Sequence, residues 1–254
     1  MKHIGKSYDK VDAKGILSGK PSYTGDFVPK DALIIKVLRS PHAQAKIKSI
    51  DTSKAKLIPG VEAIFTYEDV PNTRFTLAGQ TYPEPSAYDA LILDPVVRYV
   101  GDEVALVVAK DEATALKAMP LIKVEYEVQK PVLDLRTAMD HETVVHPEDD
   151  ILNHIPVGQD YKRNICVSYH KRVGDIEAEL AKCDYVVEGT YFDQATRQSA
   201  MEPFQSFGYI DHLGRIVIVS STQIVFHVRR HIARALGIPA SKIRVIKPRI
   251  GGGF

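Results

Sequence analysis

The stretch "EVALVVAKDEATALKAMPLIKVEYE", residues 103–127, carries the clearest structural pattern of the chain. Its first seven residues are a nearly continuous apolar run, which is typical of a buried strand. Asp111 can cap a short helix that Pro120 ends. Residues 121–127 alternate apolar and charged, which predicts a strand with one wet face. A strand, a helix and a strand in this short span predict an α+β fold with helices on one face of a sheet.

The preceding residues continue this pattern. Strands are expected at 33–38, 45–50 and 61–66, and a short helix at 51–56. Residues 71–95 contain four prolines and no period, so they are expected to form a long loop.

The second half of the chain repeats the theme with different elements. Its expected strands cover residues 166–170, 185–191, 205–210, 215–220 and 242–246. Asp175 can cap a short helix. A longer helix is expected after Thr222 or Ser221 as its cap, with Gly237 as its end. Its expected apolar stripe comprises Val225, Val228, Ile232, Ala235 and Leu236. Periodicity is lost from residue 129 to about residue 164, which predicts a domain boundary near residues 135–160.

Composition disfavours several functions. The 254 residues carry 33 basic and 32 acidic side chains, so no global field would attract nucleic acid or an anionic membrane. We find no apolar run long enough for a membrane helix and no signal peptide, so the expected location is cytoplasmic. Cys166 and Cys183 form no CxxC pair, so any iron–sulfur cluster is expected on another chain.

Chemical motifs are sparse when they are judged from the residues alone. The run Gly251–Gly253 follows a strand and suits either a ligand loop or a flexible tail. Gln223 follows a strand end, where capping is favoured over ligand binding. The polar face of the long helix is interpreted as a solvated basic face rather than an anion site; it comprises His227, Arg230, His231 and Arg234. The spacing of His42, His141 and His146 does not suit a metal, and no metal site is expected. Glu202 is expected to stabilise a turn.

Several longer stretches resemble one family when they are taken together. They are residues 11–27, 39–51, 59–71 and 97–118 ("VRYVGDEVALVVAKDEATALKA"), followed by 174–191, 201–211 ("MEPFQSFGYID") and 220–245. In this order they resemble the molybdenum-binding subunits of the xanthine dehydrogenase and aldehyde oxidase family. The resemblance implies an a/b hammerhead domain over 1–135, a linker over 136–160, and an incomplete, mixed-sheet start of a molybdopterin-binding domain over 161–254.

The resemblance also implies site residues. In this family the "GGGF" loop continues with further glycines and holds the molybdopterin through its backbone, which implies a cofactor-binding role for Gly251, Gly252, Gly253 and Phe254. Gln223 is similar to the family glutamine near the molybdenum centre, and this reverses the preference for capping. The family's catalytic glutamate lies outside these residues, so the sequence is expected to be a truncated subunit that is inactive alone.

The resemblance further implies an activity and its partners. The full subunit would be a molybdenum-dependent oxidoreductase that oxidises a purine, another N-heterocycle or an aldehyde, with water as the oxygen source. Iron–sulfur clusters and FAD are expected on partner subunits. An alternative is a non-catalytic hammerhead-type module for binding or assembling partner subunits. A self-contained NAD enzyme is disfavoured because the glycine fingerprint after an early strand is missing.

Overall fold

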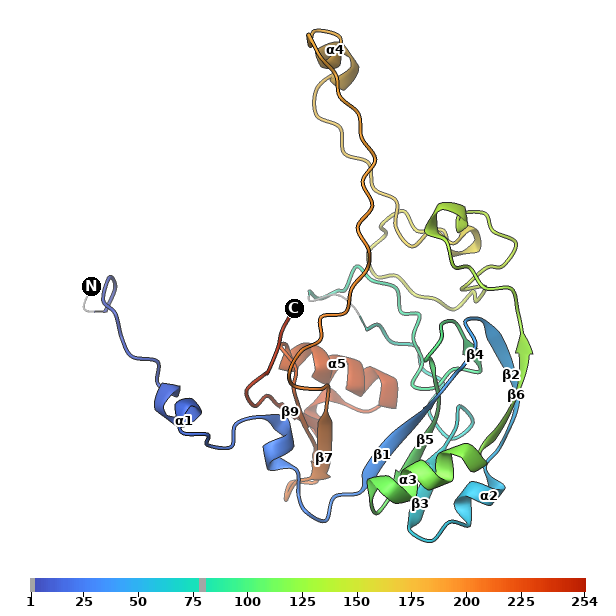
Figure 1. The fold of residues 1–254 in the computed structure, drawn as a ribbon, viewed down its shortest axis with the longest axis vertical. Coiled ribbons are helices and arrows are strands. Elements are labelled where there is room, and N and C mark those ends of the chain that lie inside the picture. Colours follow the sequence, from blue (N-terminus) through green and yellow to red (C-terminus); the bar gives the residue numbers. More distant parts are fainter. Residues whose placement is uncertain (1–2, 78–80) are drawn as a thin grey trace.

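Three small sheets organise the chain in the computed structural model, which describes residues 3–77 and 81–254 (Figure 1). The strands are β1 (Ile34–Arg39), β2 (Ala45–Asp51), β3 (Val61–Phe65), β4 (Val96–Val97), β5 (Glu103–Ala109), β6 (Lys123–Val128), β7 (Ser206–Ile210), β8 (Ile216–Ser220) and β9 (Ile243–Ile246). The helices are α1 (Ala13–Leu17), α2 (Ser53–Lys56), α3 (Glu112–Ala118), α4 (Ile176–Leu180) and α5 (Val225–Leu236). This mixture confirms the predicted α+β class.

Strand β5 is the centre of the first sheet, in which it pairs antiparallel with both β1 and β3. Val107 and Ala109 are fully buried and share a core cluster with Ala115 and Ala118 of helix α3. Burying a valine side chain contributes about 1.5–3 kcal/mol, so this strand is a main source of stability. The Asp111 carboxylate caps α3 by accepting a hydrogen bond from the Thr114 N–H at 2.7 Å. The strand, helix and strand predicted from residues 103–127 are therefore confirmed.

The second sheet has the order β4–β2–β6 and shares the core of the first. Leu38, Ile50 and Val124 pack against both buried clusters, one centred on β5 and α3 and the other on β2 and β4. The two-residue strand β4 is missing from the sequence-based prediction because so short an element shows no period.

The third sheet is mixed, as predicted: β7 and β8 pair antiparallel, and β8 and β9 pair parallel. The turn between β7 and β8 is stabilised by Asp211, whose Oδ1 accepts hydrogen bonds from the N–H groups of Leu213 and Arg215, both at 2.9 Å. Helix α5 connects the two parallel strands and packs on β9. Because β8 and β9 are parallel, the residues that follow β8 and the residues that follow β9 lie at the same edge of the sheet.

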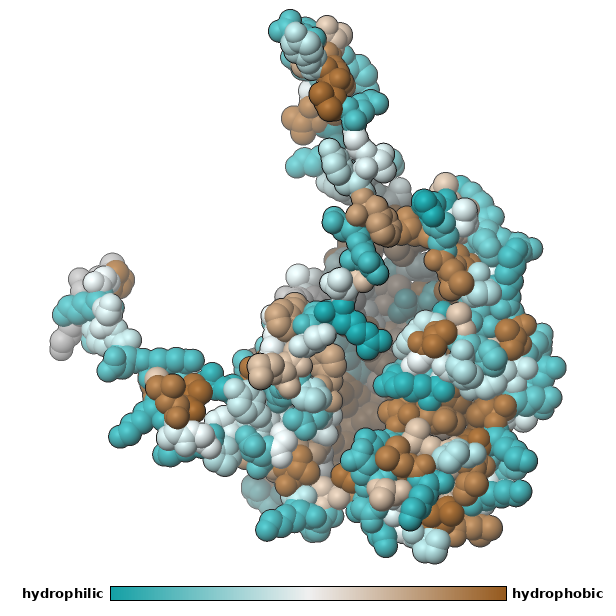
Figure 2. All heavy atoms as spheres, in the orientation of Figure 1, coloured by the Kyte–Doolittle hydropathy of each residue, from teal (hydrophilic) through white to brown (hydrophobic). Residues whose placement is uncertain are grey.

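Residues 166–199 form a long arm that extends away from the sheets and carries α4 (Figure 1). Every residue of this arm is exposed. Asp175 caps α4 as predicted, but the strands predicted at 166–170 and 185–191 are wrong. Their alternating pattern needs a continuous hydrogen-bonded neighbour, and the described part of the chain provides only one such bond, from the Ser168 N–H to the Val157 carbonyl at 2.9 Å. Figure 2 shows hydrophobic side chains gathered at the far end of the arm, around α4.

Irregular segments connect the sheets. The predicted loop over residues 71–95 is confirmed for its described part, while residues 78–80 lie outside the described residues. Arg98 links this region to the predicted linker, because its guanidinium contacts Asp94 at 2.7 Å and Glu148 at 2.5 Å. None of the helices in the described residues has the length and apolar character needed to cross a membrane.

Candidate functional site

Gln223 lies in the turn between β8 and α5, and it is exposed. The helix has Ile224 as its N-cap, without a side-chain cap, so the prediction that Thr222 or Ser221 caps α5 is wrong. The Thr222 hydroxyl instead accepts a hydrogen bond from the Ile224 N–H at 3.2 Å, which stabilises the turn before the helix. This extra turn presents the Gln223 amide at the end of strand β8, where open sheets often bind ligands.

The glycine run after β9 packs too closely against the chain for any side chain. A Cβ at Gly251 would overlap the Glu202 side chain, and a Cβ at Gly252 would lie 2.6 Å from the Ala200 Cβ. The Gly251 N–H donates a hydrogen bond to Glu202 Oε2 at 2.6 Å, which holds the loop in place. Glycine is therefore required at these two positions because only a bare backbone fits.

The turn and the glycine run line one cavity of about 500 Å³. Gln223, Gly252, Gly253 and Phe254 all contribute to its wall. A Cβ at Gly253 would lie 3.1 Å from Gln223 Nε2, so the amide and the loop are direct neighbours. Gly251 faces Glu202 beside this cavity. The structure thus brings the residues singled out in the sequence together, although they are almost 30 positions apart.

The cavity wall suits a polar cofactor that carries phosphate or amide-like edges. The Gly251 N–H is already bonded to Glu202, but Gly252 and Gly253 line the cavity without side chains, so a ligand can approach their backbone closely. The Gln223 amide can both donate and accept hydrogen bonds. Glu202 Oε1 is buried and has no hydrogen-bond partner within the described residues, but Glu202 lies behind the glycine run and is not part of the cavity wall. The residues present therefore fit a pterin-type cofactor.

Described residues of the loop 71–95 pack against the polar face of α5. The side chains of His227 and His231 are each only 12% exposed. Arg230 donates hydrogen bonds to the Thr81 carbonyl at 3.2 Å and to Glu84 Oε1 at 3.0 Å. The interpretation of a solvated basic face is therefore wrong, because a loop distant in sequence packs on it.

A second arginine of α5 extends this contact. The Arg234 guanidinium lies 4.4 Å from the centre of the Tyr88 ring and donates a hydrogen bond to the Arg74 carbonyl at 2.7 Å. Two arginines one helical turn apart thus join the helix to the loop.

Glu84 is the residue that the sequence-based reasoning missed. It is only 1% exposed, and its Oε2 accepts a hydrogen bond from the Tyr88 hydroxyl at 2.7 Å. Burial raises the pKa of Glu84, but the hydrogen bonds from Tyr88 and Arg230 outweigh burial, and the pKa lies below its usual value. The same environment raises the pKa of Tyr88 to about 12, first through burial and then through the bond to Glu84. Glu84 is thus an ionised carboxylate in the interior.

Two family models match the chain. Residues 18–130 match the a/b hammerhead domain of aldehyde oxidase and xanthine dehydrogenase, and residues 157–254 match the molybdopterin cofactor-binding domain. The second match includes Gln223 and the whole glycine run.

Curated relatives support these matches over nearly the full chain. It is 40% identical to the probable hypoxanthine oxidase XdhD of Escherichia coli K12, over 99% of this chain and 29% of that protein. It is 31% identical to the nicotinate dehydrogenase large molybdopterin subunit of Eubacterium barkeri, over 99% of this chain and 55% of that subunit. The chain therefore spans roughly a third to a half of the length of these relatives.

Two solved structures share the fold of this chain. The aldehyde oxidoreductase of Desulfovibrio desulfuricans matches with a TM-score of 0.80 and 25% identity, over 98% of this chain and 27% of that protein. The aldehyde oxidoreductase of Desulfovibrio gigas matches with a TM-score of 0.78 and 26% identity, over 98% and 27% of the two chains.

Proposed function

Because the chain belongs to the aldehyde oxidase and xanthine dehydrogenase family, we propose that it supplies two parts of a molybdenum-binding subunit. Residues 1–135 are the hammerhead domain, residues 136–160 are a linker, and residues 161–254 belong to the molybdopterin-binding domain. The observation that carries this proposal is the cavity on which Gln223 and the glycine run meet.

The residues of this chain would hold the cofactor, while the redox chemistry belongs to the cofactor itself. Bound in the cavity, molybdenum–molybdopterin supplies two-electron oxidation, which no side chain can perform alone. Gly251, Gly252, Gly253 and Phe254 form the loop that approaches it through the backbone. Gln223 orients it through its amide, and Glu202 holds the loop through the Gly251 N–H. These are positioning roles, so we assign no catalytic residue to this chain.

The whole subunit would act as a molybdenum hydroxylase. Its substrate class is a purine, another N-heterocycle or an aldehyde, and water is the source of the oxygen. Relatives named for hypoxanthine and nicotinate support the N-heterocycle class. We further propose that electrons leave through iron–sulfur and FAD-containing partner subunits in the cytoplasm, because the two cysteines of this chain are both exposed and form no cluster motif.

The proposal is tested by measuring molybdenum and pterin in the purified subunit that contains these residues, made in a host that synthesises molybdopterin. Gly252→Ala should reduce the cofactor content about tenfold, because its Cβ would lie 2.6 Å from the Ala200 Cβ. Gln223→Ala should lower turnover more than cofactor content. Gly15→Ala is a matched control, because its nearest neighbour is a flexible lysine carbon at an ordinary 3.7 Å.

Two outcomes would contradict the proposal. Turnover by residues 1–254 alone, with a full complement of cofactor, would show that they contain an active site of their own. A subunit that carries partner proteins but neither molybdenum nor pterin would instead support the non-catalytic assembly module.

A further inference from the structure

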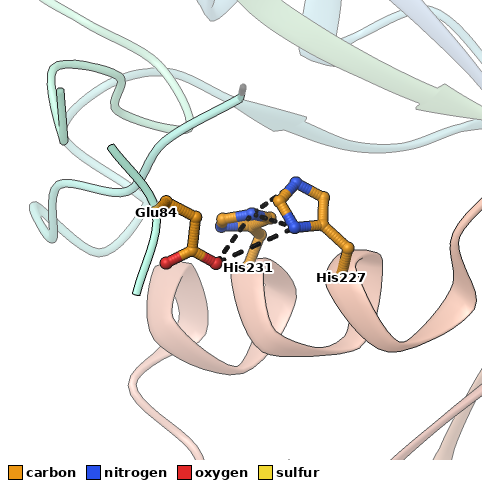
Figure 3. A group of neighbouring side chains, drawn as sticks. All are labelled: Glu84, His227 and His231. Atoms are coloured by element: carbon orange, nitrogen blue, oxygen red, sulfur yellow. Dashed lines mark hydrogen bonds and ion pairs between the residues drawn. The ribbon is translucent and has the colours of Figure 1, made fainter. Parts of the chain in front are cut away.

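Three potential ligand atoms converge where the loop of residues 71–95 meets α5 (Figure 3). Glu84 Oε1 lies 3.8 Å from His227 Nδ1 and 3.9 Å from His231 Nε2, and these two nitrogens are 3.1 Å apart. A point in the plane of the three atoms lies about 2.1 Å from each of them, which matches the Zn–N and Zn–O bond lengths in proteins. The triangle therefore has the size that a zinc ion requires.

The helix supplies its two imidazoles through periodicity. His227 and His231 are four positions apart in α5, so their side chains lie on one face. Burial lowers the pKa of both imidazoles, Arg230 adds to this effect at His227, and His227 adds to it at His231. Both rings are therefore neutral near neutral pH, which is the form that binds metals. The buried Glu84 carboxylate brings the negative charge that a divalent cation needs.

The contacts between the two imidazoles do not give their ring nitrogens well-aligned hydrogen bonds. His231 Nε2 lies 2.7 Å from His227 Nε2 and 3.1 Å from His227 Nδ1, two atoms of the same ring. The donor and acceptor directions of those two atoms diverge, so at most one contact can be a well-aligned hydrogen bond. The two rings are nearly perpendicular, at 81°, with His231 Nε2 over the face of the His227 ring. A bound cation would therefore require the His227 ring to rotate so that the in-plane lone pair of Nδ1 points at the ion.

We propose that Glu84, His227 and His231 bind one divalent transition-metal ion of the zinc class. Three protein ligands leave a further position for water. The ion would tie the loop of residues 71–95 to α5, across almost 150 positions of sequence. This departs from the expectation of no metal site, which considered other histidines and overlooked the HxxxH spacing. The proposal does not rest on the proposed function, because it makes no use of Gln223 or the glycine run, although His227 also lines the cavity beside them.

Arg230 opposes the ion without blocking the site. Its Nη2 lies 3.0 Å from Glu84 Oε1 and 3.3 Å from His227 Nδ1, so its positive charge repels a cation. Glu84 Oε1 has two lone pairs, and it can accept a hydrogen bond from Arg230 and bind a metal together. Removing the charge with Arg230→Gln should therefore tighten binding about tenfold or more.

The test titrates the chain with Co²⁺ and then Zn²⁺ after treatment with a chelator. Both cysteines are replaced by serine in every variant, because they are free and exposed. We expect one ion per chain, with the intense visible absorption of four-coordinate Co²⁺, which Zn²⁺ then abolishes. Glu84→Gln, His227→Gln and His231→Gln should each weaken binding about tenfold or more. His212→Gln, at an exposed turn position, is the matched control and should bind like wild type.

Far-UV circular dichroism verifies that α5 is retained in each variant. Failure of the folded wild-type chain to take up one equivalent of either ion would overturn the proposal. Retention of that equivalent by the double variant His227→Gln/His231→Gln would also overturn it. The Arg230→Gln variant should bind the metal ion more tightly, a change that misfolding cannot produce. An unchanged affinity for the ion would show that it binds at another site.

Discussion

At the scale of single residues, two neighbouring places in the chain have special requirements. One holds a buried charge, and the other leaves room only for the backbone of glycine. Glu84 is an ionised interior carboxylate because Tyr88 and Arg230 donate hydrogen bonds to it. Gly251 and Gly252 lie where a Cβ would meet neighbouring side chains. His227 contacts both regions, since it lines the glycine cavity and lies 3.8 Å from Glu84. Substitutions at these residues should therefore act through protonation or steric fit.

The buried imidazoles predict a pH-dependent stability. Their pKa values in the folded protein lie below the ordinary 6.5, so the unfolded chain binds more protons as the pH falls through this value. The free energy of unfolding should therefore fall below about pH 6.5. Urea unfolding at about pH 7.5 and pH 5.5, with a chelator present, should show a smaller pH effect for His231→Gln than for wild type.

Burial sets the direction of this effect, and the charges that face the imidazoles change its size. Arg230 disfavours protonation of both rings, Arg234 adds to this at His231, and Glu84 favours protonation. Glu84→Gln should therefore steepen the loss of stability on acidification. An equal pH slope for wild type and His231→Gln would contradict this account.

At the scale of elements, helix capping and core packing contribute separately to stability. Asp111 and Asp175 both cap short helices by accepting a hydrogen bond from the backbone N–H three residues on. Helix α3 buries Ala115 and Ala118 in the core, whereas α4 buries none of its residues. The same local motif therefore stabilises the folded protein in one case and only a local turn in the other.

This difference predicts unequal effects of one substitution. Asp111→Ala should lower the free energy of unfolding by about 1 kcal/mol, because the cap belongs to a helix that folds with the core. Asp175→Ala is the matched control and should change it by less than about 0.5 kcal/mol. Urea denaturation followed by circular dichroism measures both, and equal losses would show that α4 folds with the core.

At the scale of the whole molecule, two sheets share one core, while the arm of residues 166–199 projects from it (Figure 1). The arm exposes large apolar side chains such as Tyr185, Val187 and Tyr191, each at least 90% accessible. These residues alternate in the manner of a strand, yet none of the described residues pairs with them. The exposed backbone of the arm should be far easier to open than the core.

Limited proteolysis tests this difference. Trypsin should cleave first within residues 166–199, for example after Lys171 or Lys182, which are both exposed. Lys123 lies in β6 and should be cleaved much later, although its side chain is also accessible, because a paired strand cannot enter a protease site. Simultaneous cleavage at both places would contradict a stable core with a labile arm.

The sequence by itself determined the elements whose pattern is local. The apolar run of β5, the Asp111 cap and the Asp175 cap each arise within a few residues, so periodicity and capping patterns were sufficient to predict them. Ordered motifs also indicated the family and brought attention to Gln223 and the glycine run.

Only the tertiary structure decided which distant segments meet. The expected strands at 166–170 and 185–191 did not form, because a strand depends on a partner that its own residues cannot supply. The two histidines on the polar face of α5 became largely buried because the loop carrying Glu84 packs on them. Burial and charge pairing act between residues far apart in sequence, and therefore no local pattern could assign Glu84, His227 and His231 to one cluster.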